Sequence, residues 1–277
     1  MARNNQRRTR SAPKNETSKV TTKSSVLDFV SPTEYVDLPS QGRFYEEGHP
    51  FHNLDTIEIR YMTAKDEDIL TNQTLLRKGI ALEKLLENIL GNYEVDPGTL
   101  LIGDRNAIIV AARSTGYGSS YTTSVTCPAC QATTKLAFNL DDVQVNNGNT
   151  EGVVVTDRGT FEVELPLTKV TAEVRLLNGE DERELAREIS NKKSDIWESL
   201  HTSQLERMIV SLNGETARDV INKFVELMPA HDSRRLREAH ESLTPSIDFS
   251  HNFECNECGH EQKLGVPFTV DFFWPNR

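Results

Sequence analysis

The chain has 277 residues, of which 36% are hydrophobic, enough to bury the core of one large domain or two small ones. Its net charge is −11 at pH 7, but the first 24 residues carry about +6 and the remainder about −17. No apolar run reaches the roughly 18 to 20 residues that cross a bilayer, and the polar sequence after the basic N-terminus argues against a secretory signal peptide.

The chain begins with a basic, polar segment. Residues 1–25 are rich in Arg, Lys, Asn, Ser and Thr and lack large apolar side chains, so we expect a disordered tail. Such a tail suits an acidic protein surface or nucleic acid, or it is simply solvated. Residues 26–45 mix isolated apolar residues with Pro39 and Gly42, which favours an extended arm ending in a turn.

A strand and three helices are predicted next. Residues 56–62 alternate apolar and polar, the period of a half-buried strand. Thr63 is a good N-cap with Asp66 at the capping-box position, so a helix follows directly. Leucines and isoleucines at helical spacing predict a core-facing helix over residues 74–90. A third helix, capped by Asp104, ends near Gly116.

Strands dominate until residue 177, and helices follow. Residues 121–140 read as strand, knuckle, strand, and residues 153–155 and 160–165 as a hairpin with a third strand at residues 170–177. Residues 180–242 are helical and highly charged, with predicted caps at Thr216 and Ser233. Another strand, at residues 247–253, leads into a second knuckle.

All four cysteines lie in two Cys-x-x-Cys pairs: Cys127, Cys130, Cys255 and Cys258. In a reducing compartment this pattern reads as metal ligands rather than disulfides, and two such turns supply the four thiolates that tetrahedral zinc needs. A full shell of four cysteines leaves no open position, so we expect a structural Zn2+. A redox dithiol, the absence of metal and His260 as a competing ligand are the alternatives.

No group of residues argues for catalysis. The glycine-rich residues 116–120 lack the Gly-Lys-Ser/Thr ending of a phosphate loop. The run from Asp66 to Asp68 is explained by a helix N-terminus, and His231, Asp232 and Ser233 by a capped helix start, because adjacency in sequence does not create the geometry of a triad.

The predicted fold is α+β, a mixed body with a four-cysteine zinc ribbon closed by two distant knuckles and a helical insertion between them. We predict a tail (1–25), an N-terminal α+β region with the first knuckle (26–142), a hairpin with the helical insertion (150–245), and a second knuckle with an aromatic C-terminal segment (246–277). The two knuckles are the only self-similar elements apparent in the sequence.

Several blocks together resemble the baseplate hub protein family of contractile-tailed, T-even-type bacteriophages. They are residues 38–42 (LPSQG) followed by Phe44-Tyr45, residues 62–70 (MTAKDEDIL), residues 127–130 (CPAC), and the Cys255 knuckle with residues 272–275 (FFWP). Their order is more specific than any single block.

This resemblance implies a non-enzymatic structural or assembly role in the tail baseplate, in the virion or in the host cytoplasm during assembly, with other tail or baseplate proteins as partners. Aromatic and proline-stiffened segments are typical of interface hot spots, so we predict partner-binding residues at both ends of the body, with packing on the chain's own core as the alternative. They are Leu38, Pro39, Phe44, Tyr45, Phe272, Phe273, Trp274 and Pro275. The other functional hypothesis is a zinc-ribbon nucleic-acid-binding protein that uses its basic tail.

Overall fold

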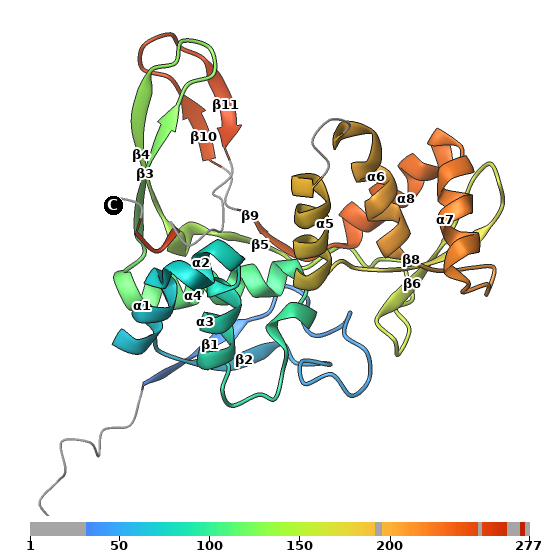
Figure 1. The fold of residues 1–277 in the computed structure, drawn as a ribbon, viewed down its shortest axis with the longest axis horizontal. Coiled ribbons are helices and arrows are strands. Elements are labelled where there is room, and N and C mark those ends of the chain that lie inside the picture. The colour runs from blue at the N-terminus through green and yellow to red at the C-terminus, as the bar shows by residue number, and fades with distance from the viewer. Residues whose placement is uncertain (1–31, 192–195, 249–250, 265–271, 275–277) are drawn as a thin grey trace, which may run out of the picture. The chain divides into compact units, whose positions relative to one another are not determined.

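The computed structural model describes residues 32–191, 196–248, 251–264 and 272–274 (Figure 1). Helices and short antiparallel strands alternate along the chain, which confirms the predicted mixed α+β class. The predicted tail at residues 1–25 lies outside the described residues.

A hairpin followed by helices opens the fold. Strand β1 (Thr33–Asp37) pairs antiparallel with β2 (Thr56–Arg60), as the alternating pattern predicted for β2. Helix α1 (Ala64–Thr71) begins with the predicted capping box between Thr63 and Asp66. The predicted helix over residues 74–90 is two helices, α2 (Gln73–Lys78) and α3 (Ala81–Ile89), because Gly79 adopts a left-handed φ of 69° that ends α2.

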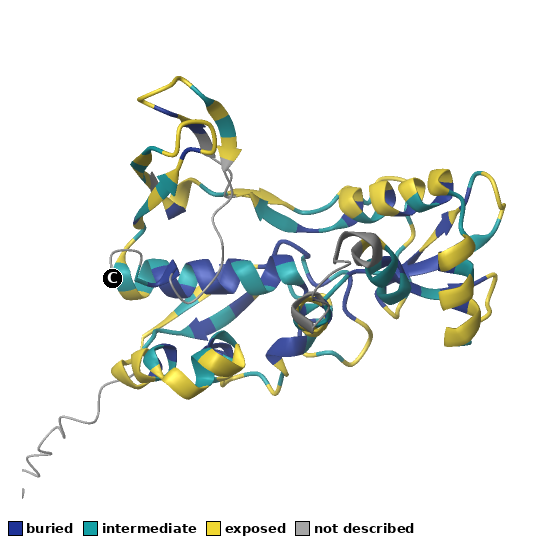
Figure 2. Ribbon diagram, turned by 45° about the horizontal axis from the view of Figure 1, so that its top comes forward, coloured by how far each residue is buried: buried dark blue, intermediate teal, exposed yellow. Residues whose placement is uncertain are grey.

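Helix α4 (Ile102–Tyr117) follows a short 3-10 turn, η1 (Pro97–Thr99), and is buried along most of its length (Figure 2). Asp104 does not cap it as predicted, since α4 begins two residues earlier and Asp104 is fully buried. Beyond α4, β3 (Ser120–Thr126) and β4 (Thr133–Asn139) form a hairpin with the first knuckle at its tip. After a second 3-10 turn, η2 (Leu140–Asp142), comes β5 (Gln144–Asn146).

The second part of the chain contains a three-stranded sheet in the order β6 (Thr160–Glu164), β7 (Thr171–Arg175), β8 (Ile209–Leu212). The predicted hairpin between residues 153–155 and β6 is reduced to one bridge, Val155 to Phe161, and β6 pairs with β7 instead. Strand β8 arises inside the segment predicted to be helical, where the apolar residues Ile209, Val210 and Leu212 extend the sheet of β6 and β7.

The remaining elements are helical until the second knuckle. They are α5 (Gly179–Asn191), α6 (Ile196–Met208), α7 (Arg218–Leu227), α8 (Ala230–Leu243), β9 (Ser246–Asp248), β10 (His251–Glu254) and β11 (Glu261–Leu264). The predicted caps are wrong: α7 begins after Ala217 and α8 after Pro229.

The structure also contradicts the prediction that only the knuckles are self-similar, because residues 33–139 and 160–264 repeat one plan. We call them the first and second copy. Each begins with a hairpin, β1–β2 or β6–β7, paired in the same register, since Thr33 lies opposite Arg60 as Thr160 lies opposite Arg175. A helix follows (α1 or α5), and after intervening elements that differ between the copies comes a long helix (α4 or α8) and then a hairpin that carries a Cys-x-x-Cys knuckle.

Matching contacts between the same positions support this correspondence. Arg60 donates two hydrogen bonds to Asp66 at 2.7 and 2.9 Å, and Arg175 donates two to Asp181, both at 2.7 Å. These arginines are the last residues of β2 and β7, and the aspartates lie in the first turns of α1 and α5, so the same ion pair joins a strand to the next helix in each copy.

A second repeated contact joins the first hairpin to the long helix. The amide of Ser40 donates to Asp104 Oδ1 at 2.9 Å, and the amide of Leu167 donates to Asp232 Oδ1 at 2.9 Å. Both aspartates are fully buried, and Asp104 precedes Cys127 by as many residues as Asp232 precedes Cys255. The chain is therefore an internal duplication.

The two copies exchange segments and share one core. Strand β5, in the segment that follows the first copy, pairs with β9 of the second. In return, Phe272, beyond the second ribbon hairpin, packs on Tyr121 of the first copy with ring centroids 5.1 Å apart, and its carbonyl accepts from Arg113 of α4. One cluster of buried apolar side chains accordingly contains residues of both copies, among them Ile108 and Leu236.

Candidate metal centre

The two knuckles meet and bring the four cysteines together. Cys127 Sγ lies 3.7 Å from Cys258 Sγ, and Cys130 Sγ lies 3.6 Å from Cys255 Sγ. All four sulfur atoms lie within 4.8 Å of one another, although more than 100 residues of chain separate the pairs. Each copy thus supplies one half of the cluster.

Each knuckle is a tight turn with the same hydrogen bonds. The carbonyl of the first cysteine accepts from the residue four positions later, Gln131 at 2.9 Å or Gly259 at 2.8 Å. Both of these residues have a left-handed φ, 62° for Gln131 and 69° for Gly259. The amide of the first cysteine donates across the turn to Ala132 or His260. These bonds hold both cysteines of a pair on one side of the turn.

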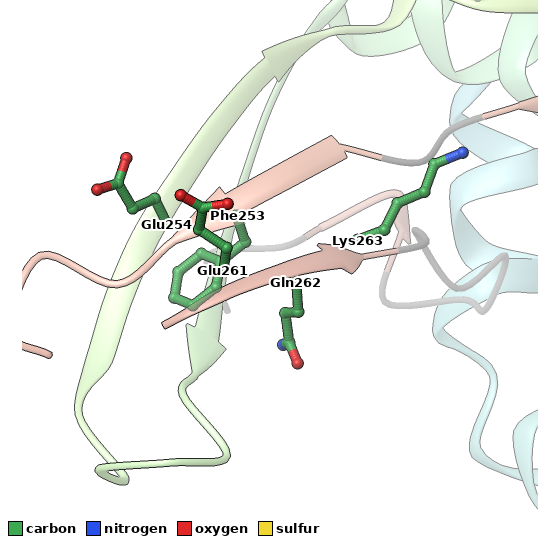
Figure 3. Close-up of a pocket in the computed structure, with 5 residues that line it drawn as sticks. All are labelled: Phe253, Glu254, Glu261, Gln262 and Lys263. Atoms are coloured by element: carbon green, nitrogen blue, oxygen red, sulfur yellow. The ribbon is translucent and has the colours of Figure 1, made fainter. Parts of the chain in front are cut away.

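The surroundings of the cluster are small and only half closed. Cys127 and Cys255 are buried with Phe253, and Val125 and Ala132 pack against them. Figure 3 shows Phe253 and Gln262 on one face of the β10–β11 hairpin, with Glu254 and Glu261 on the other. The hollow beside this hairpin is lined by these four residues and Lys263. None of these described lining residues is a serine, cysteine or histidine.

The electrostatics of the cluster favour a bound cation. Amide hydrogen bonds, chiefly from Cys130, lower the pKa of the Cys127 thiol to about 6. An amide hydrogen bond from His260 acts in the same direction at Cys258, but the neighbouring thiols outweigh it and raise the pKa of Cys258 to about 12. Four thiolates this close repel one another unless a divalent cation neutralises them.

The arrangement fits a tetrahedral metal ion. With metal–sulfur bonds of about 2.3 Å, ideal tetrahedral geometry places sulfurs roughly 3.8 Å apart, close to the two distances across the knuckles. Among the described residues, the group that could hold a metal consists of the four cysteines, and His260 is not part of it. Four sulfur ligands complete the shell, so a metal here has no open position for a substrate.

The predicted partner-binding residues lie mostly inside the body. Leu38, Phe44, Tyr45, Phe272 and Phe273 are buried in the main core. Pro39 is also buried, Trp274 is partly buried, and Pro275 lies outside the described residues. The structure thus brings these segments onto the chain's own core, and their contact with a partner remains a prediction.

Buried polar groups that hold these segments were not predicted from the sequence. Asp104 accepts from the Ser40 and Tyr45 hydroxyls at 2.6 and 2.8 Å. Burial raises the pKa of Asp104, although these hydrogen bonds oppose the effect. Arg113 donates to the carbonyls of Phe272 and Gly118, which ties the end of the second copy to α4. The available signal in the sequence was the presence of two charged residues, Asp104 and Arg113, among the apolar residues of a predicted helix.

Asp232, which stands between His231 and Ser233, has a structural role. Burial would raise its pKa, but the amides of Leu167 and Thr168, each 2.9 Å away, lower it. Both of its oxygens face these amides, which leaves the carboxylate no place in a proton relay.

The model of the T4 bacteriophage base plate protein family matches residues 32–274. No curated protein and no solved structure matches the chain. Among the described helices, none is both long and apolar enough to cross a bilayer.

Proposed function

The chain belongs to the T4 bacteriophage base plate protein family, and we propose that it is a non-enzymatic structural or assembly component of the tail baseplate hub. The family match over residues 32–274, which includes every described residue, is the observation that carries this proposal. Its partners are then other tail proteins, and its place is the virion tail or a baseplate intermediate in the host.

We infer that the cysteine cluster holds a structural Zn2+. The sulfur distances, the all-thiolate donor set and the paired turns support zinc over a redox dithiol, because sulfur contacts of 3.6 and 3.7 Å join cysteines of different knuckles into one group of four. Zinc fastens the ribbon hairpin of the first copy to that of the second. Its role is to hold the two copies in register.

A non-enzymatic role agrees with the chemistry of the described polar clusters. The buried acids Asp66, Asp104, Asp181 and Asp232 each bind an arginine or the backbone and sit on separate structural joints. We therefore propose that the function depends on shape and contact. The aromatic segments at residues 38–45 and 272–274 contribute to it by completing the body, and we retain the direct contact of residues 38–45 and 272–275 with a partner as a prediction.

The test is to purify baseplate intermediates from infected cells that produce a tagged chain. We expect the chain to co-purify with tail proteins and to contain about one zinc per chain, bound by four cysteines. A Cys258→Ser chain should lose zinc and incorporation, whereas Asn256→Ser in the same exposed knuckle should keep both. Absence of the wild-type chain from the intermediates, together with salt-dependent binding to DNA or RNA, would favour the nucleic-acid-binding alternative.

A further inference from the structure

The two copies differ in the loop that joins their first two strands. Corresponding hydrogen bonds close both loops, from Leu38 to Asp55 at 2.8 Å and from Leu165 to Val170 at 2.9 Å. The first loop spans residues 39–54 and the second only residues 166–169. The second copy therefore lacks the long loop of the first.

In the first copy, the long loop covers the segment that leads into α4. Its ring side chains Tyr45, His49 and Phe51 pack against one another. His49 Nε2 lies 3.0 Å from Thr99 Oγ1, and the amide of Leu101 donates to the Tyr45 hydroxyl at 3.1 Å. Leu100, between these two contacts, is fully buried.

In the second copy, the corresponding segment leads into α8 without such a cover. Because α4 and α8 align through Asp104 and Asp232, the residues equivalent to 99–101 are Leu227, Met228 and Pro229. Leu227 is 74% exposed, and the other two are partly exposed. Leu167, 61% exposed at the tip of the short loop, lies beside the same helix start, since its amide binds Asp232. We call these four residues the uncovered face.

The polar groups that Tyr45 binds in the first copy have no unsatisfied equivalent in the second. Tyr45 in the first copy satisfies Asp104 and the amide of Leu101. In the second copy, Thr168 supplies the second hydrogen bond to Asp232, and Pro229, equivalent to Leu101, has no amide hydrogen to donate. What remains for a ligand is apolar surface, which suits aromatic and aliphatic contact rather than hydrogen bonding.

We propose that the uncovered face docks an aromatic loop from a neighbouring tail protein, which takes the place that residues 43–53 occupy in the first copy. This proposal rests on the proposed function, because that function supplies the neighbour. A second copy of the same chain cannot supply the loop, since its own Phe44, Tyr45 and Phe51 are buried in its own core. Aromatic side chains in an apolar pocket are the usual anchors of such contacts.

The test replaces both exposed leucines by lysine. Lysine suits position 227 because a cation is favourable at the C-terminus of α7, so Leu167→Lys/Leu227→Lys should fold and keep its zinc. We expect its incorporation into baseplate intermediates to fall at least tenfold. Val154→Lys, at an 82% exposed position outside the face, should be incorporated like the wild type. Normal incorporation of the double variant overturns the proposal.

The occupant is identified by a photo-crosslinking residue at position 227 in the assembled intermediate. We expect a crosslink to an aromatic-containing segment of a different tail protein. A crosslink to another copy of this chain or to nucleic acid overturns the proposal. If even the wild-type chain is absent from the intermediates, the proposed function itself fails, so the two failures are distinguishable.

Discussion

Asp66→Asn should lower the free energy of unfolding by roughly 2.5 kcal/mol at neutral pH. Burial alone would raise the pKa of Asp66, but hydrogen bonds from Arg60, Thr63 and Asn88 outweigh it and lower the pKa from 3.8 to about 2. At about 1.36 kcal/mol per pKa unit, this difference gives the magnitude stated. The carboxylate is fully buried, so solvent screens the interaction little.

The effect should depend on pH in a defined direction. Because the pKa is lower in the folded than in the unfolded chain, the stabilisation is complete above the ordinary pKa and is lost as the pH falls through the folded value. The difference in free energy of unfolding between the wild type and Asp66→Asn should therefore shrink to about half near pH 3.

Urea unfolding at about pH 7 and pH 3 measures both values. Asp68→Asn, an exposed change of the same charge in the same helix, is the control and should cost under about 0.5 kcal/mol. Asp181→Asn should destabilise the second copy in the same way, since Arg175 loses the charge of its partner and one of its two acceptor oxygens. A gap of equal size at both pH values for Asp66→Asn would refute the reasoning.

Three further changes test other joints of the fold. Removing the metal with a chelator should release amide protection in β3, β4, β10 and β11 while α4 stays protected, because the ribbon has its own small core; uniform loss of protection would contradict this. Tyr45→Phe should cost about 1–3 kcal/mol in urea unfolding, since the Leu101 amide loses its acceptor and Asp104 one donor; an unchanged midpoint would be inconsistent with the network. Arg113→Met should cost a similar amount, about 1–3 kcal/mol, and raise the hydrogen exchange of residues 272–274, whereas protection as in the wild type would argue against the clamp.

The parts of the structure that follow from local chemistry were predictable. The alternation before Arg60 and the Thr63–Asp66 capping box indicated β2 and the start of α1. Cysteine spacing predicted that Cys127 and Cys255 would belong to one cluster, because few other uses are open to paired Cys-x-x-Cys turns. The break between α2 and α3 was not predicted, because a single glycine is tolerated within a helical pattern. In the structure, Gly79 ends α2.

The duplication was not predicted from the sequence for a physical reason. The residues that recur in both copies lie at contacts between elements, such as the Arg–Asp ion pair and the buried aspartate of the long helix. The surface residues differ between the copies. The number of residues between matching positions also differs, because of the loop of residues 39–54 and the different helices between Asp66 and Asp104. A search for Leu-Pro, Glu-x-Arg and a later aspartate, in that order ahead of each knuckle, would have found it.

The exchange of segments between the copies sets a condition on biosynthesis. Phe272 and Phe273 complete the core around α4, whose own residues leave the ribosome far earlier. During synthesis, the first copy therefore cannot complete its hydrophobic core until residue 273 has been made. A host chaperone that shields the incomplete first copy during synthesis would increase the yield of folded protein.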